Sequence, residues 1–222
     1  MSDHFVLSIV ICFVIGYALG NINPSYLIVR RKGYDVRKDG SGNAGASNAF
    51  ILAGKTAFLM VVVFDILKAY AACRICRALF PELTIAEYIG GVACILGHMF
   101  PMTLGFRGGK GLASLGGVAL SWNWRYFFLL LATAILIALV TRYVCFVAPA
   151  MSVIFPGLFY WHTQFAAAAL ILAIPTLPII LKHVENFGRI RNGTEARFSY
   201  MWNKDAELKR LGRTDERRQN QK

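Results

Sequence analysis

Three polar segments of this chain combine residue types that can bind and neutralise phosphate. The first, residues 40–48, reads GSGNAGASN and contains the spacing G-x-G-x-x-G. A dinucleotide-binding turn needs a hydrophobic strand before that spacing, whereas residues 35–39 (DVRKD) are mostly charged. The nucleotide interpretation therefore fails. What remains is a glycine-rich turn before a helix, whose exposed N–H groups can form an anion-binding concavity.

The second segment, residues 97–114, reads GHMFPMTLGFRGGKGLAS. It is not a Walker A loop, because Leu104 stands where that pattern needs glycine and Gly111 stands where it needs Ser or Thr. Lys110 nevertheless lies between glycines just before a helix, so its ammonium and nearby N–H groups can meet one phosphate. His98 is either a structural hydrogen-bonding residue at a helix end or a direct participant.

The third segment, residues 183–195, reads HVENFGRIRNGTE. His183 and Asn186 are three residues apart and share a helix face, where they can hold a hydroxyl or a phosphate. His183 could instead be a simple interfacial anchor, and Glu185 is expected to pair with Arg189. The chain contains no His-x4-Asp, G-x-S-x-G or HExxH pattern, so a covalent acyl-enzyme has no support.

The elements that position these segments are hydrophobic helices. Of the 222 residues 56% are hydrophobic and 16% charged, against about 25% charged in soluble domains. About 20 apolar residues span the 30 Å hydrocarbon layer, and such segments recur along the chain. We therefore expect an all-α membrane protein with seven transmembrane helices, at residues 5–23, 56–79, 83–100, 112–122, 125–141, 146–162 and 164–182. The fourth would rise only about 17 Å, so it spans only if residues 105–111 continue it or if it is locally buried.

The basic residues set the expected orientation. Net charge is +12, and the cations lie between and after the apolar segments, which favours membrane topology over nucleic-acid binding. With the N-terminus outside, only Arg74, Arg77 and Arg125 of the 24 basic residues are external, and Lys68 lies within the second helix. The remaining twenty and all three polar segments fall on the cytoplasmic side, as does the C-terminus. One composite phosphate site at the inner leaflet is the simplest inference.

Other features fit a single membrane domain, residues 1–196, followed by a basic polar tail, residues 197–222. Residues 205–211 of the tail could form a short helix on an anionic leaflet, or the tail could stay solvated. The five cysteines lie in or beside apolar runs, and Cys73-x-x-Cys76 has no second pair, so we expect neither disulfides nor a metal. Asp65 and Lys68 are expected to form an ion pair inside the bundle rather than a proton relay.

The three polar segments resemble the motifs of the PlsY family of acyl-phosphate:glycerol-3-phosphate acyltransferases. The first is similar to GSGNxGATN, with Ser47 in the Thr place; the second to GHxxPxxxxFKGGKG, with Arg107 in the Lys place; the third to HxENxxRLxxGxE. The resemblance implies a multi-pass enzyme of the bacterial inner membrane without metal or cofactor. It would transfer a fatty acyl group from acyl phosphate to the sn-1 hydroxyl of glycerol 3-phosphate, giving lysophosphatidic acid and phosphate. Its partners would be these substrates and the lipid bilayer, with no nucleic acid and a monomeric or weakly oligomeric state.

The resemblance also implies roles for individual residues. The catalytic residues would be Ser41, Lys110, His183 and Asn186. The substrate-binding residues would be Gly40, Gly42, Asn43, Gly45, Ser47, Asn48, His98, Arg107, Gly108, Gly109, Gly111, Cys145 and Glu185. The glycine-rich turn would hold the acyl-phosphate head, Lys110 would neutralise phosphate, and His183 with Asn186 would position the acceptor. The general base would be His183 or a phosphate oxygen of the donor itself.

Two positions depart from the family pattern. Ile51 stands where the family usually has Arg, and Cys145 stands where it usually has Ser. A divergent relative with low activity is therefore one alternative. A transporter of a phosphorylated solute is another, although transporter sites generally lie near the midplane, whereas these motifs gather at one face.

Overall fold

The computed structural model describes residues 3–210, and within that range the secondary structure is entirely helical. The N-terminal α-helices are α1 (Asp3–Asn21), α2 (Pro24–Arg30), α3 (Ala46–Ala53), α4 (Lys55–Leu79), α5 (Ala86–Met99) and α6 (Leu112–Trp122). The C-terminal ones are α7 (Trp124–Thr141), α8 (Val147–Thr163), α9 (Ala166–Ala173), α10 (Thr176–Leu181), α11 (Val184–Arg191) and α12 (Lys204–Arg210). Short 3-10 turns are η1 (Met102–Leu104), η2 (Val144–Phe146) and η3 (Phe198–Met201).

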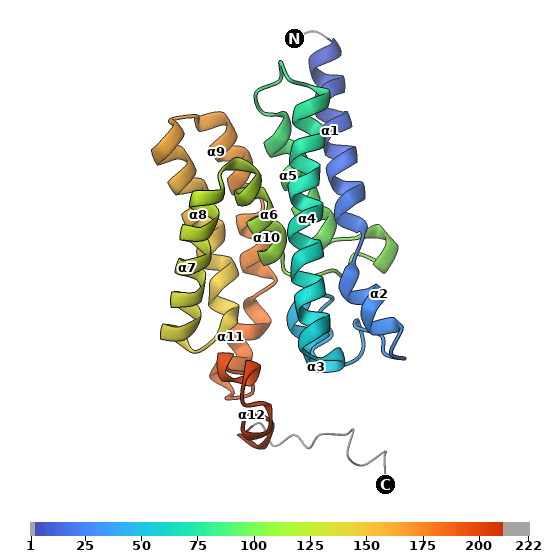
Figure 1. The fold of residues 1–222 in the computed structure, drawn as a ribbon, viewed down its shortest axis with the longest axis vertical. Coiled ribbons are helices and arrows are strands. Elements are labelled where there is room, and N and C mark those ends of the chain that lie inside the picture. The colour runs from blue at the N-terminus through green and yellow to red at the C-terminus, as the bar shows by residue number, and fades with distance from the viewer. Residues whose placement is uncertain (1–2, 211–222) are drawn as a thin grey trace.

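The long helices stand roughly parallel, with α1, α4 and α5 on one side and α7 to α10 on the other (Figure 1). Helices α1 and α5 touch through glycines: a Cβ on Gly16 or Gly20 would collide with backbone carbonyls of α5. Small residues at such a contact let two backbones approach closely, as is common in membrane bundles. On α7 the large side chains point outward, with Leu136 60% and Val140 73% exposed, as expected of a surface that faces lipid.

The prediction of seven spans is confirmed in part. Five helical stretches are long and apolar enough to cross a membrane: His4–Arg30, Lys55–Leu79, Trp124–Thr141, Val144–Thr163 and Ala166–Arg191. The other two expected spans are short, with 14 residues in α5 and 11 in α6, or rises of about 21 and 17 Å. Residues 105–111 do not lengthen α6, because they form the turns and extended backbone after η1.

Helix boundaries differ from the predicted ones where proline and capping residues act. The expected helix at 164–182 is divided into α9 and α10 at Pro175, whose ring removes a backbone donor. The first expected helix ends earlier, at Asn21, and α2 starts anew with Pro24 as its first residue. The Asn23 side chain caps α2 by accepting a hydrogen bond from Tyr26 N–H. These short helices position the polar segments.

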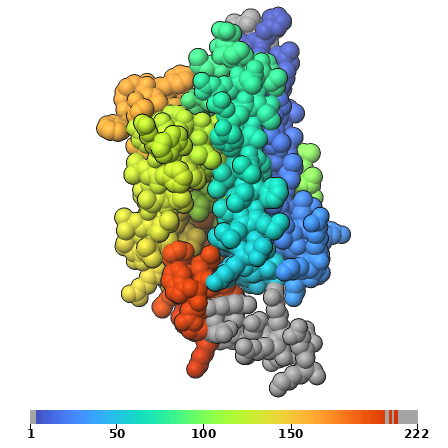
Figure 2. Space-filling model, viewed as in Figure 1, coloured from blue at the N-terminus to red at the C-terminus, as the bar shows by residue number. Residues whose placement is uncertain are grey.

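The two ends of the described chain lie at opposite ends of the molecule, with α1 starting at the top of Figure 1 and α12 lying at the bottom beside α11. In the space-filling view, residues of the C-terminal segment cover the lower end of the molecule next to α4 (Figure 2). All five cysteines are free and buried, which confirms that they pack as small apolar residues. Residues 211–222 of the predicted tail lie outside the described range.

Candidate functional site

The glycine-rich turn, residues 40–45, is shaped from within by Asn48 on α3. Asn48 is fully buried; its Oδ1 accepts from Ser41 N–H at 2.8 Å, and its Nδ2 donates to the carbonyls of Val36 (2.9 Å) and Asp39 (3.0 Å). Gly40 has φ of +65°, and a Cβ there would collide with the Asn48 amide. A glycine is therefore required at position 40. Asn48, which was expected to bind substrate, instead uses its side-chain hydrogen bonds to hold the turn.

The same turn corrects the expectation of an open nest of backbone donors. Ser41 N–H is used by Asn48, and Gly42 N–H donates to Asp39 O at 3.2 Å. Gly45 N–H donates to Asn43 O at 2.9 Å. Ser41 and Gly42 are exposed and Asn43 is half-buried. The Ser41 hydroxyl and the Asn43 side chain are therefore better placed to meet a ligand than these backbone amides.

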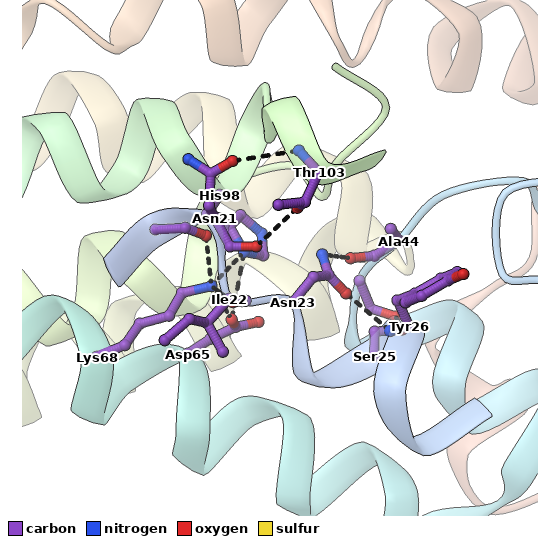
Figure 3. Close-up of polar contacts among 12 residues, drawn as sticks. Asn21, Ile22, Asn23, Ser25, Tyr26, Ala44, Asp65, Lys68, His98 and Thr103 are labelled. Carbon is purple, nitrogen blue, oxygen red and sulfur yellow. Dashed lines mark hydrogen bonds and ion pairs between the residues drawn. The ribbon is translucent and has the colours of Figure 1, made fainter. Parts of the chain in front are cut away.

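Three ionisable side chains, Asp65 and Lys68 of α4 and His98 of α5, form a buried cluster (Figure 3). Lys68 Nζ lies 2.7 Å from Asp65 Oδ1, which confirms the expected ion pair. His98 Nδ1 lies 3.0 Å from Lys68 Nζ and 3.2 Å from Asp65 Oδ1. Lys68 also donates to the carbonyls of Gly20 (3.3 Å), in the last turn of α1, and of Ile22 (2.8 Å), between α1 and α2. His98 is thus part of a structural cluster that ties α4 and α5 to the α1–α2 junction.

The other face of the His98 ring supports the second polar segment. A Cβ on Gly109 would collide with His98 Nε2 and would lie 3.2 Å from the Ala44 carbonyl. Gly109 N–H in turn donates to His98 O at 3.1 Å. Lys182 Nζ reaches Gly108 O at 3.5 Å from the end of α10. The 108–110 loop therefore lies between the glycine-rich turn and the third segment, which brings the three polar segments together as expected.

Lys110 and Asn186 form the centre of this arrangement. Lys110 Nζ donates to Asn186 Oδ1, and Asn186 Nδ2 donates to Glu195 Oε1 at 2.6 Å. Glu195 Oε2 accepts from Arg189 Nε at 2.7 Å. Because a carboxylate only accepts hydrogen bonds, Glu195 fixes the Asn186 amide with its oxygen toward Lys110. The four residues form one continuous polar chain at the start of α6 and around α11.

His183 is buried beside this chain, at the N-terminal end of α11, with 3% of its surface exposed. Its Nδ1 lies 2.7 Å from the Ile179 carbonyl. Since a carbonyl cannot donate, Nδ1 carries the proton of the neutral ring and Nε2 carries the lone pair. His183 is therefore held in the tautomer that can accept a proton at Nε2.

Lys110 is half-buried and has an unusually low pKa for a lysine. Desolvation, and then the positive charge of Arg189, lower the pKa of Lys110 to about 8, while Glu195 partly opposes this shift. The ammonium is thus poorly compensated in the free protein. A negatively charged ligand at this position would be bound favourably, because it supplies the missing counter-charge and stabilises the ammonium form of Lys110.

The other predicted residues lie outside this centre. Ser47 on α3 and Arg107 after η1 are exposed, and the Glu185 side chain is 85% exposed. Glu185 lies 3.7 Å from Arg189, the expected partner, although Arg189 makes its closer contact with Glu195. Cys145 in η2 is buried, and it is among the groups that oppose the lowering of the Lys110 pKa.

Three residues of the site were not predicted: Arg189, Glu195 and Lys182. Arg189 and Glu195 belong to the third motif, and the spacing HxENxxRxxxGxE contained the signal. Lys182 lies next to His183 in the sequence, but nothing in its spacing indicates that it crosses to the second segment. Besides Gly108, it stacks its ammonium over the Phe100 ring at 4.9 Å.

Known proteins are similar to this chain in sequence and in fold. The family model described as Glycerol-3-phosphate acyltransferase matches residues 10–193. Glycerol-3-phosphate acyltransferases of Brucella anthropi and Lactiplantibacillus plantarum are 35% and 37% identical, over 86% of this chain and 94% and 92% of their own lengths. A crystal structure of PlsY, an integral membrane glycerol 3-phosphate acyltransferase in its glycerol 3-phosphate form, has 31% identity and a TM-score of 0.78. That similarity covers 87% of this chain and 97% of the PlsY chain.

Proposed function

The chain belongs to the PlsY family of glycerol-3-phosphate acyltransferases, and from this premise we propose that it uses acyl phosphate as donor and acylates the sn-1 hydroxyl. It is an integral membrane protein that acylates glycerol 3-phosphate. The observation that carries the donor assignment is the half-buried, poorly compensated Lys110 ammonium at the meeting point of three polar segments. Two phosphate-bearing substrates need such a centre, and the acyl chain of one can lie in the bilayer.

The proposed chemistry is a direct transfer. Acyl phosphate is an activated mixed anhydride, so the protein mainly brings the substrates together and stabilises charge. The acceptor oxygen forms a bond to the acyl carbon, and the bond from that carbon to the phosphate oxygen breaks, which releases inorganic phosphate. The Ser41 hydroxyl and the Asn43 side chain hold the donor head, and Lys110 neutralises the leaving phosphate.

His183 and Asn186 position the acceptor in this scheme. The Nε2 lone pair of His183 supports a role as general base for the acceptor hydroxyl, since Ile179 fixes the proton on Nδ1. A phosphate oxygen of the donor is the other possible base, and a His183→Gln variant separates the two. If the donor's phosphate takes the proton, this variant retains most of kcat; if His183 takes it, kcat falls by about 10²-fold or more.

The proposed setting is the bacterial inner membrane, with the N-terminus outside, the C-terminus and site cytoplasmic, and seven crossings. The opposite ends occupied by α1 and α12 agree with an odd number of crossings (Figure 1). The bias of basic residues supports the orientation. Residues 1–196 would be the catalytic domain and residues 197–222 its tail. A monomeric or weakly oligomeric state stays a prediction.

Phosphate release tests the function. Purified protein in detergent or lipid mesophase is given palmitoyl phosphate with and without glycerol 3-phosphate, and lysophosphatidic acid is identified by mass spectrometry. We expect release that depends on the acceptor. No release from folded protein would contradict the donor assignment, and release that does not depend on the acceptor would contradict acyl transfer; either result would favour a low-activity relative. Flux of phosphorylated solutes into liposomes would then test the transporter alternative.

The Lys110 pKa predicts a pH dependence for acceptor use. Burial lowers the pKa of Lys110 to about 8, so the ammonium is present below pH 8 and is lost above it. A phosphate monoester has its second pKa near about 6, so the acceptor is already a dianion at pH 7. We expect kcat/KM for glycerol 3-phosphate to be near its plateau at about pH 7, to be about half of it at pH 8, and to approach a tenfold fall per pH unit above about pH 9.

The Lys110→Arg variant is the control for this profile. A guanidinium stays charged throughout the range, so any residual activity of the variant should lack the decline above pH 8. An equal decline in the parent and the variant would show that another group titrates.

A further inference from the structure

The C-terminal segment, Arg197–Arg210, packs across the end of the molecule that we propose faces the cytoplasm. Phe198 N–H donates to the Arg142 carbonyl at the end of α7, at 2.7 Å. The Tyr200 ring meets the edge of Phe50 on α3, with ring centroids 5.5 Å apart. Tyr200 also lines a shallow pocket of about 210 Å³ together with Ile51. The segment therefore contacts both sides of the helical bundle.

Within this segment, Arg210 is hydrogen-bonded to the backbone that follows α11. Its guanidinium donates to Gly193 O at 3.0 Å and to Glu195 O at 2.6 Å. Its Nε and second terminal nitrogen donate to Glu207 Oε1 at 2.9 and 2.6 Å. Glu207 is 5% exposed and also accepts from Arg197 N–H at 2.8 Å. Arg210 is thus oriented by Glu207, and its planar fork reaches two carbonyls at once.

Glu195, one of the two residues that Arg210 bonds, also orients the centre of the site. Glu195 gives its backbone carbonyl to Arg210 and its carboxylate to Asn186 and Arg189. The Asn186 oxygen in turn receives Lys110. A shift in the backbone of residue 195 would move the carboxylate and turn the Asn186 amide, and small misplacements of positioning groups lower rates strongly.

We propose that Arg210 is a positioning residue for acyl transfer, acting through Glu195 on Asn186. The inference rests on the proposed function for its kinetic consequence. Arg210 lies outside the part of the chain that the family model matches, which ends at residue 193. Arg210 itself need not touch either substrate.

The test compares Arg210→Ala and Arg210→Lys with Lys209→Ala in the full chain. Lys209 lies on the same short helix and is exposed, so Lys209→Ala removes the same charge as Arg210→Ala. We expect Arg210→Ala to lower kcat/KM for glycerol 3-phosphate about tenfold, mainly by raising its KM, with the KM for palmitoyl phosphate unchanged. Arg210→Lys should restore little, because an ammonium cannot bond both carbonyls in the fork geometry. Lys209→Ala should match the parent.

Two further measurements separate positioning from general stability. A Glu195→Gln/Arg210→Ala double variant should be no slower than Glu195→Gln alone, since both changes act on one path. Amide hydrogen exchange of residues 193–195, whose N–H groups donate to carbonyls of α11, should be faster in Arg210→Ala than in Lys209→Ala.

Several outcomes would overturn the proposal. Arg210→Ala could match Lys209→Ala in kcat/KM, its effect could add fully to that of Glu195→Gln, or it could impair both substrates equally together with a lower melting temperature. Unchanged exchange at residues 193–195 would overturn it whether or not the protein is active. A parent without acceptor-dependent release would instead refute the proposed function, and the exchange measurement would still decide the role of Arg210.

Discussion

Replacing Lys110 by alanine is expected to lower kcat/KM by about 10²- to 10³-fold, the usual effect of removing one preorganised donor to developing charge. Lys110 supplies a half-buried ammonium, and its contact with Asn186 holds it at the meeting point of the three segments. Without it, the leaving phosphate would develop its charge beside Asn186 and the other segments with no cation at position 110. The effect should appear in kcat as well as in KM, because the leaving group gains charge during transfer.

The matched control is Lys38→Ala. Lys38 is an exposed lysine just before the glycine-rich turn, so Lys38→Ala removes the same charge near the same site. Because this charge is exposed, kcat/KM should change by no more than about threefold. Initial rates of acceptor-dependent phosphate release, with melting temperatures in detergent, give the comparison. A Lys110→Ala enzyme that folds and keeps a rate near that of the parent would contradict the assigned role.

The three candidate segments could be found in the sequence because each one carries its chemistry within a few consecutive residues. Lys110 between glycines and His183 three residues before Asn186 could be recognised without a structure. The prediction that the segments share one side of the membrane rests only on the positions of apolar stretches and basic residues. The structure confirms that the segments meet, through Gly109 beside Ala44 and Lys110 beside Asn186.

What could not be predicted depends on partners distant in the sequence or on competition within a turn. The N–H groups of Ser41 and Gly42 are occupied because they donate locally, to the Asn48 side chain and to the Asp39 carbonyl. The roles of Arg210 and of Lys182 depend on how helix ends meet. Short helices such as α2 and α3 were missed because seven or eight residues give too little periodicity, and packing sets their boundaries.

Loss of the buried ion pair should have the largest effect on stability. In Lys68→Met the Asp65 carboxylate, 2% exposed, would lose its closest cation, and the carbonyls of Gly20 and Ile22 would lose their donor. Removing one partner of a buried pair typically costs about 3–5 kcal/mol. We expect a much lower melting temperature in detergent and a reduced monodisperse fraction on size-exclusion chromatography.

A double replacement distinguishes an uncompensated charge from lost packing. In Asp65→Asn/Lys68→Met the buried group at position 65 is neutral, so much of the lost stability should return, because the main cost in the single variant is the unpaired carboxylate. The coupling between the two changes should be about 1–3 kcal/mol. Simple additivity of the two changes would mean that Lys68 acts mainly through the α1–α2 carbonyls, and the cluster would then join the helices by hydrogen bonds rather than by charge.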